Sequence, residues 1–197
     1  MEAFHLLDAV AVPLASANID TDQILPARYL QKPRANNFGA YLFHDVRRDA
    51  RGAPRADFPL NQAVYTTARI AVAGRNFGCG SSREHAVWAL FDGGFRAVIA
   101  PGFGDIFQSN ALKNGLLPVV LPQALVQQLL DTLKLVPGLR LRVDLVEQIV
   151  SAPGMAPAPF TVDAFSRHCL LEGLDTLDYT LTQMAAIEAY EHRTSET

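Results

Sequence analysis

One short turn concentrates the residue types that could do chemistry. Residues 74–86 read GRNFGCGSSREHA, in which three non-adjacent glycines lead into two serines, an arginine, a glutamate and a histidine. Glycine permits left-handed backbone angles and close approach of the main chain to a ligand. A helix that begins after such a turn presents free N–H groups and the positive end of its dipole. The segment therefore indicates an anion-binding turn that carries hydroxyl groups and a guanidinium.

Ser81 has two further interpretations on spacing alone. Glu84 stands three positions later, as in a capping box, in which each side chain accepts a hydrogen bond from the other residue's backbone N–H. His85 stands four positions later, as a base for a serine nucleophile could, although a histidine one turn into a helix is more often packed. Capping is the commonest of these patterns, and Cys79 between two glycines is typical of a small buried residue.

The turn departs from the known phosphate and hydrolase motifs. Arg83 stands where GxGxxG has its third glycine, and the lysine of a nucleotide P-loop is missing. The serines do not fit GxSxG either. These departures argue against a dinucleotide site, a P-loop and a hydrolase elbow.

Strands and helices must alternate around the turn to position it. The apolar run 68–73 predicts a strand before the turn, and residues 82–91 predict a helix that two glycines stop. Strand 96–100, helix 105–114, strand 116–121 and amphipathic helix 123–135 are predicted next. This alternation predicts parallel strands joined by right-handed crossovers.

The flanking regions complete a single α/β domain. Residues 5–14 predict a strand that leads into the polar loop 16–22, residues 139–146 and 160–162 predict further strands, and 163–173 and 182–191 predict helices. Residues 28–60 are typical of a long, polar, mobile connection, where we look first for substrate contacts. No repeat or second domain is indicated, so we expect one domain over 1–197 with a C-terminal helical extension from about residue 160.

The composition excludes several classes of protein. The chain has 197 residues, 17 Lys plus Arg against 20 Asp plus Glu, and 49% apolar residues, which is typical of a folded domain and lacks the basic face of a nucleic-acid binder. It has neither a signal peptide pattern nor an apolar run long enough to cross a membrane. Cys79 and Cys169 are too few for a disulfide scaffold, so we expect a cytoplasmic protein.

Three segments, in the expected order, carry a resemblance to a known family. Residues 77–86 (FGCGSSREHA) resemble the signature of the swivelling domain of the aconitase superfamily. Residues 18–30 (NIDTDQILPARYL) resemble the second signature of the isopropylmalate dehydratase small-subunit family, and residues 160–175 (FTVDAFSRHCLLEGLD) resemble the tail of its longer bacterial form. The resemblance covers essentially the whole chain. It implies a stand-alone subunit with a swivelling β/β/α fold, in which helices flank a partly parallel sheet.

The resemblance also implies roles for particular residues. Ser81 corresponds to the catalytic base. The implied substrate-binding residues are Ser82, Arg83, Asp22, Thr21 and one further cation. For that cation the sequence leaves three candidates open, namely Arg34, Lys32 and Arg28.

The implied reaction is the interconversion of 2- and 3-isopropylmalate by dehydration and rehydration, in leucine biosynthesis. The substrate is a small dicarboxylate hydroxy acid, for which guanidinium groups are suitable partners. An alcohol resembles water, whose pKa is about 15.7, so a serine that works as a base near pH 8 needs a shift costing about 11 kcal/mol. A helix end contributes at most about 2 kcal/mol. We therefore expect the isolated chain to be inactive until a partner seals the site.

The expected partner is a large subunit, in a heterodimer or higher heteromer. The 4Fe–4S cluster of the family is expected on that large subunit, because two cysteines without cluster spacing cannot hold it. We expect no metal or cofactor on this chain, and neither nucleic acid nor a membrane as a partner.

Two other functions stay open at this point. One is the small subunit of a homoaconitase or a related hydroxy-acid dehydratase, which residues 26–32 should distinguish because they reach the substrate's variable side chain. The other is a non-catalytic anion-binding or RNA-binding regulatory module on the same scaffold, in which Ser81 only caps a helix. RNA binding would require a broad basic face.

Overall fold

A seven-stranded mixed sheet forms the centre of the molecule in the computed structural model, which describes residues 1–35 and 37–195. Its first four strands are parallel, in the spatial order β4 (Leu117–Val120), β3 (Ala97–Ala100), β2 (Ile70–Ala73), β1 (Leu6–Leu14). Antiparallel strands continue the sheet beyond β1 in the order β5 (Arg140–Asp144), β6 (Ile149–Ser151), β7 (Ala158–Pro159). The predicted α/β class with a partly parallel sheet is confirmed.

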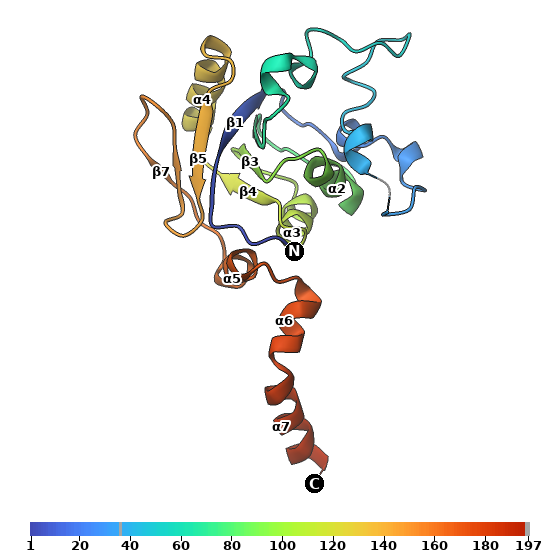
Figure 1. Cartoon of the computed structure of the whole chain (residues 1–197), viewed down its shortest axis with the longest axis vertical. Helices are drawn as coiled ribbons and strands as arrows, with labels where there is room; N and C mark the ends of the chain where they lie inside the picture. The colour runs from blue at the N-terminus through green and yellow to red at the C-terminus, as the bar shows by residue number, and fades with distance from the viewer. Residues whose placement is uncertain (36, 196–197) are drawn as a thin grey trace.

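Helices cover both faces of the parallel strands. Helices α2 (Glu84–Asp92) and α3 (Asp105–Lys113) lie on one face and α4 (Gln123–Leu135) on the other, as Figure 1 shows. Every residue of β2 and β3 is buried, which is why these strands read as continuous apolar runs in the sequence.

Alternate residues of the strands enter two separate cores. The core on the α2 side takes Val12, Ala71, Ala73, Val98 and Ala100, together with Val87 and Leu90 of α2 and Phe107 of α3. The core on the α4 side takes Ala11, Ile70, Val72, Ala97 and Ile99, together with the helical stripe Val126, Leu129, Leu130 and Leu133. The period-two alternation along each strand thus fixes which helices each strand can contact.

The connection 28–60 is fastened to the body, although we expected a polar, mobile segment there. Phe38, Leu42 and Phe43 are buried in the core on the α2 side. Short 3-10 helices occur at Ala27–Tyr29, Phe38–Tyr41, Pro59–Asn61 and Ala63–Tyr65. The polar majority of this segment masked a few large apolar anchors. Residue 36 lies outside the described part.

The C-terminal region differs from the prediction at one strand and contains one unpredicted helix. Residues 160–162 are not a strand, because the edge strand β7 precedes them and Asp163 then caps α5 (Ala164–Glu172) by accepting from the Ser166 N–H at 2.9 Å. The helix expected at 182–191 is confirmed as α7 (Met184–Ser195). A further helix that was not predicted, α6 (Thr176–Thr182), precedes it and begins with a capping box between Asp175 and Asp178.

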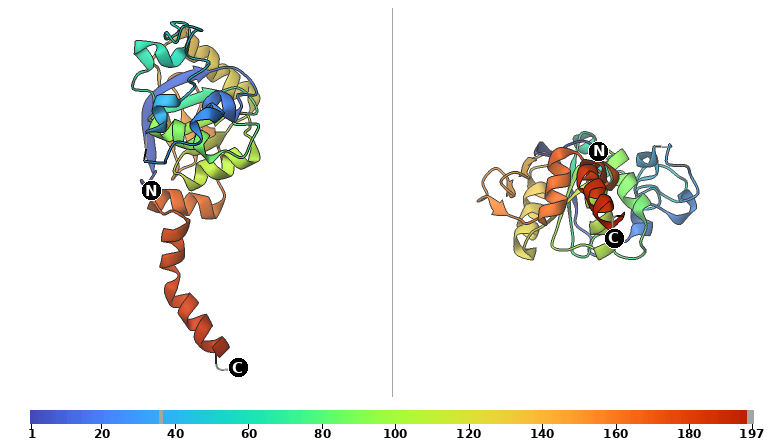
Figure 2. Two further views of the ribbon diagram at one scale, coloured as in Figure 1. Left: turned by 90° about the vertical axis from the view of Figure 1, so that its right-hand side faces the viewer. Right: turned by 90° about the horizontal axis from the view of Figure 1, so that it is seen from below.

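The C-terminal helices differ in how they contact the body. Helix α5 packs on it, since Leu170 is fully buried and its carbonyl accepts from the Phe4 N–H at 2.8 Å. Helices α6 and α7 extend away from the body, as both Figure 1 and the left view of Figure 2 show. Residues 196–197 of the expected extension lie outside the described part. None of the helices described is both long enough and apolar enough to span a membrane.

The turn after β2 can approach α3 only because residue 78 is glycine. Gly78 has a φ of +70°, and a Cβ added there would lie 2.2 Å from Cγ of the buried Phe107 ring. Gly94, after α2, has a φ of +96° but no atom within 4 Å of an added Cβ. An alanine at either position would have a strained backbone angle, but only an alanine at residue 78 would also clash with the core.

We expect Gly78→Ala to lower the free energy of unfolding by about 2–5 kcal/mol, because it combines left-handed strain with a clash in the core. Gly94→Ala, the control, should cost about 1–2 kcal/mol from the backbone angle alone. Urea unfolding of the two variants measures both values. Equal losses would contradict the packing described for Gly78.

Candidate active site

The turn that carries Ser81 lies at the carboxyl edge of the parallel strands. There the chain after β1 continues alongside the chain after β2: the Gly78 N–H donates to the Ile19 carbonyl at 2.7 Å, and the Thr21 N–H donates to the Cys79 carbonyl at 2.9 Å. Ligands of open α/β sheets bind at this edge. The two signature segments recognised in the sequence are thus held side by side by backbone hydrogen bonds.

Ser81 does not cap α2. The N-cap residue is Arg83, whose side chain makes no capping bond, and the Glu84 carboxylate accepts instead from the Asn114 Nδ2 amide at 2.7 Å. The capping-box interpretation is therefore wrong. The side chains of the turn leave the positive end of α2 uncapped, as an anion-binding site requires.

The Ser81 hydroxyl is paired with Thr21 at the start of α1 (Thr21–Ile24). Its Oγ lies 3.2 Å from Thr21 Oγ1, which is also 3.3 Å from the Ser81 carbonyl oxygen. Thr21 is 1% exposed, whereas Ser81 and the neighbouring Ser82 are exposed. A buried hydroxyl thus supports one that faces outward.

Arg83 completes this group of residues through an ion pair with Asp22, the second residue of α1. The Arg83 side chain is 22% exposed and the Asp22 side chain 56%. The structure therefore brings together Ser81, Arg83, Thr21 and Asp22 from two segments that are about sixty residues apart. A hydroxyl, a guanidinium and a helix N-terminus at one place form an arrangement that can bind a carboxylate and hold a proton-accepting oxygen beside it.

Arg34 is not part of this group. Its guanidinium donates to both oxygens of Asp92 at 3.0 and 3.2 Å, and the same carboxylate accepts from the Phe38 N–H at 2.9 Å. Asp92 ends α2, so it lies about 12 Å from the helix start at about 1.5 Å per residue. Arg34 can reach a ligand at the turn only if its ion pair with Asp92 opens.

Arg28 is also bound to a carboxylate of the protein. It forms an ion pair with Asp45, next to His44, and its guanidinium lies 4.6 Å from the Tyr29 ring centre. Hydrogen bonding raises the pKa of Arg28 above its ordinary value and holds the pKa of Asp45 well below its usual range. Lys32 is exposed three residues beyond Tyr29.

The geometry does not support a Ser–His nucleophile pair. The His85 ring packs against Trp88 at 4.4 Å between ring centres and against Phe38 at 5.7 Å, while Ser81 Oγ is bonded to Thr21. Burial lowers the pKa of His85, which favours the neutral imidazole. His85 is therefore part of an aromatic cluster behind the turn.

The residues of this chain do not fit an iron–sulfur cluster. Cys79 is half-buried in the turn, while Cys169 is buried in α5, where burial raises the pKa of its thiol. A cluster needs several thiolates together, and the described residues contain no group of three or more His, Cys, Asp and Glu side chains arranged for a metal.

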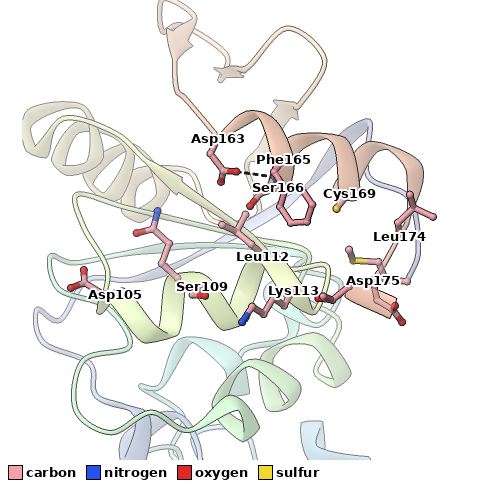
Figure 3. Close-up of a pocket in the computed structure, with 13 residues that line it drawn as sticks. Asp105, Ser109, Leu112, Lys113, Asp163, Phe165, Ser166, Cys169, Leu174 and Asp175 are labelled. Carbon is pink, nitrogen blue, oxygen red and sulfur yellow. Dashed lines mark hydrogen bonds between the residues drawn. The ribbon is translucent and has the colours of Figure 1, made fainter. Parts of the chain in front are cut away.

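A well-defined cavity lies elsewhere, between α3 and α5, and has a volume of about 490 Å³. In Figure 3, Leu112 and Lys113 of α3 face Phe165 and Cys169 of α5 across it. None of the eight residues singled out in the sequence lines it. The group around Ser81 is an open surface on this chain, which is consistent with a site that a second surface completes.

Sequence reasoning missed three features of this region. Asp45 and Asp92, the carboxylates that hold Arg28 and Arg34, gave no local signal because their partners are 17 and 58 residues away. Thr21 was placed among the substrate-binding residues, and only the fold reveals that its hydroxyl contacts Ser81.

Comparisons with known proteins show the family to which the chain is related. The family model described as the aconitase C-terminal domain matches residues 1–124. The chain is 49% identical over 193 residues to the 3-isopropylmalate dehydratase small subunit of Rhodospirillum centenum, covering 98% of this chain and 95% of that protein. It is 52% identical over 193 residues to the protein of the same name from Shewanella denitrificans, covering 97% and 96%.

A solved structure shows the same fold. The crystal structure of a 3-isopropylmalate dehydratase from Methanocaldococcus jannaschii superposes with a TM-score of 0.65 at 24% identity, covering 94% of this chain and 99% of that one. About half of the residues are identical to those of the two relatives over nearly the full length, and the family model matches more than half of the chain. Together these matches establish the family. The chain belongs to the family of 3-isopropylmalate dehydratase small subunits, within the aconitase C-terminal domain family.

Proposed function

We propose that this chain supplies the proton-accepting and carboxylate-binding half of an active site that interconverts 2- and 3-isopropylmalate. The observation that supports this most directly is the Ser81 hydroxyl, exposed beside Arg83 at the uncapped start of α2. The family's enzyme is a hydro-lyase of leucine biosynthesis. The proposal assigns its proton-transfer step to Ser81.

The reaction uses Ser81 as a base and then as an acid. The Ser81 oxygen takes a proton from the substrate carbon next to the one that bears the hydroxyl group. The electron pair of that C–H bond becomes the new carbon–carbon double bond, and hydroxide leaves from the neighbouring carbon. In rehydration the steps reverse with the two carbons exchanged. Hydroxide adds to the carbon that lost the proton, and Ser81 returns its proton to the carbon that lost the hydroxyl group.

Arg83 anchors the substrate in this proposal. A planar guanidinium binds a carboxylate through two parallel hydrogen bonds, and the N-terminus of α2 adds its partial positive charge. The carboxylate of the substrate then takes the place of Asp22, while the exposed Ser82 hydroxyl adds a hydrogen bond. Asp22 keeps the guanidinium oriented toward the turn when no substrate is bound.

Ser81 is too exposed to act as a base on this chain alone. A hydrogen bond or a guanidinium that remains in water changes a pKa little, whereas the same groups in a dry site have a large effect. We therefore propose that a large subunit covers the turn, in a heterodimer or higher heteromer, and that it carries the 4Fe–4S cluster. The cluster would assist departure of hydroxide, and the chain's own residues would carry out the rest.

Two organisational proposals follow from the same observations. The chain acts as one domain over residues 1–197 with a helical extension from about residue 160, because the two cores share a single sheet. It works in the cytoplasm, where its two free cysteines stay reduced.

The second carboxylate of the substrate needs another cation. Arg28 and Lys32 are six and ten residues beyond Asp22, whereas Arg34 is fastened to the far end of α2. We assign the second carboxylate to the segment that carries Arg28 and Lys32. The neighbouring Tyr29 and Leu30, partly buried against the core, would then lie near the isopropyl group.

Ser81→Ala in the chain reconstituted with a cluster-bearing large subunit should lower kcat about 10²–10⁴-fold, the usual contribution of a general base. Its free energy of unfolding should change by less than about 0.5 kcal/mol, because Ser81 is exposed and caps no helix. Isopropylmalate, homoaconitate and citrate are assayed in parallel, and isopropylmalate should turn over fastest.

Ser109→Ala, an exposed serine on α3, is the matched control and should behave as the native chain. A Ser81→Ala complex that keeps kcat within tenfold of the native value would refute the assignment of the base. Turnover by the isolated chain would refute the need for a covering subunit.

Arg83→Lys should lower kcat/KM about 10–100-fold, mainly through KM, because a lysine cannot form the paired hydrogen bonds to a carboxylate. Arg140→Lys is the control. Arg140 lies on the distant strand β5 and, like Arg83, pairs with an exposed aspartate, in this case Asp8 of β1 at 2.7 Å. Steady-state kinetics of the reconstituted complex measure both. Similar KM values for the two variants would contradict the role of Arg83.

Alanine substitutions separate the three remaining cations. At least one of Arg28→Ala and Lys32→Ala should raise KM about tenfold. Arg34→Ala should instead leave KM within about twofold and cost about 0.5–1 kcal/mol of stability, through loss of its partly exposed ion pair with Asp92. A rise in KM confined to Arg34→Ala would show that its ion pair opens in the holoenzyme and would overturn our assignment.

A further inference from the structure

We infer that Thr21 is a positioning residue for Ser81: its buried hydroxyl holds the Ser81 oxygen in place and redirects its own proton to that oxygen when Ser81 is ionised. This inference rests on the proposed function, because it concerns the base assigned there. It differs from a substrate-binding role for Thr21, since it places the hydroxyl against the base and away from the substrate.

The backbone fixes where the Thr21 side chain lies. Its N–H donates to the Cys79 carbonyl at 2.9 Å, and its carbonyl accepts from the Leu25 N–H at 3.0 Å. Among the described residues Thr21 is the one polar residue that falls in the fully buried set. A hydroxyl taken out of water in this way must have a hydrogen-bond partner, and both of its near neighbours are oxygens of Ser81.

The backbone angle of residue 80 directs the turn over Thr21. Gly80 has a φ of +96°, and a Cβ added to it would make an ordinary contact of 3.5 Å with Thr21 Oγ1. The left-handed angle, and not a shortage of space, therefore favours glycine where the turn brings Ser81 to Thr21.

Counting hydrogens gives the two states of the pair. Each hydroxyl has one proton to donate and two lone pairs to accept with. When Ser81 is neutral, it donates to Thr21 Oγ1 across 3.2 Å, and Thr21 donates to the Ser81 carbonyl across 3.3 Å. When Ser81 has lost its proton, its oxygen can only accept, so Thr21 turns its O–H from the carbonyl to that oxygen. Only rotation about the Thr21 Cβ–Oγ1 bond is needed.

The proton balance is simple. As the partner covers the site, the Ser81 proton passes to a water molecule that leaves with it, and Thr21 then donates to the ionised oxygen. When that oxygen takes the carbon-bound proton of the substrate, Ser81 again donates to Thr21, and Thr21 returns to the carbonyl. A hydrogen bond to the charged form lowers the pKa of an acid, so Thr21 favours the form of Ser81 that acts as a base.

The test compares Thr21→Val and Thr21→Ser in the complex reconstituted with the large subunit. Valine keeps the shape of threonine and removes the hydroxyl, so kcat should fall about 10–100-fold while KM stays within about twofold. Loss of a hydrogen bond to the ionised form raises the pKa of Ser81, so the acidic limb of the kcat profile should move to higher pH by about 1–2 units. Thr21→Ser keeps the hydroxyl and should restore both the rate and the profile.

Thr132→Val is the matched control, because the Thr132 hydroxyl also donates to a backbone carbonyl, that of Gln128 at 2.8 Å, on the distant helix α4. It should leave kcat and the pH profile unchanged. If Thr21→Val fails to form the complex, Thr21→Ala measured against Thr21→Ser gives the same comparison.

Three results would overturn the inference: an unchanged rate and pH profile in Thr21→Val, a change in KM alone, or failure of Thr21→Ser to restore the rate. Ser81→Ala separates this inference from the proposed function. If Ser81→Ala is inactive and Thr21→Val behaves as the native chain, only the role of Thr21 fails. If Ser81→Ala stays active, the proposed function itself fails.

Discussion

The candidate site depends on one backbone junction, at which the chain leaving β1 is hydrogen-bonded to the chain leaving β2. The bonds from Gly78 N–H to the Ile19 carbonyl and from Thr21 N–H to the Cys79 carbonyl align two segments that are about sixty residues apart. Without this alignment Thr21 would not lie under Ser81, and Asp22 would not face Arg83. Backbone amides make these bonds, so the junction tolerates different side chains around a fixed geometry.

Two glycines make the junction possible for different reasons. Gly78 leaves no side chain where the turn meets Phe107, whereas at Gly80 a Cβ would fit and only the backbone angle favours glycine. Both residues have left-handed backbone angles, which a residue with a Cβ adopts only at a cost. The glycine spacing that first suggested an anion site is thus explained by packing as well as by ligand approach.

Much of the fold could be predicted from local pattern. Ile70–Ala73 and Ala97–Ala100 are continuous apolar runs because helices cover both faces, and the stripe from Val126 to Leu133 matches the helical period. Patterns of this kind report burial, which is why the parallel pairing of these strands was predictable. The strand predicted at residues 160–162 was wrong because Phe160 is buried without being part of a strand.

The site was only partly predictable, because its contacts are long-range. The spacing of Ser81 and Glu84 favoured a capping box. In the structure the Ser81 hydroxyl is instead bonded to Thr21, and the Glu84 carboxylate accepts from Asn114. The carboxylates that hold Arg28 and Arg34 come from Asp45 and Asp92, and no local rule connects these partners. The resemblance to a family pointed to the residue types at the turn, while the fold alone shows which atoms meet.

The ion pair between Arg83 and Asp22 has a consequence for copies of the chain that have not yet found a partner. A guanidinium already matched by an internal carboxylate has little surplus attraction for free anions, which must displace Asp22 to bind. Under the proposed assembly, a copy of the chain without its large subunit would therefore compete weakly for the free carboxylic acids around it.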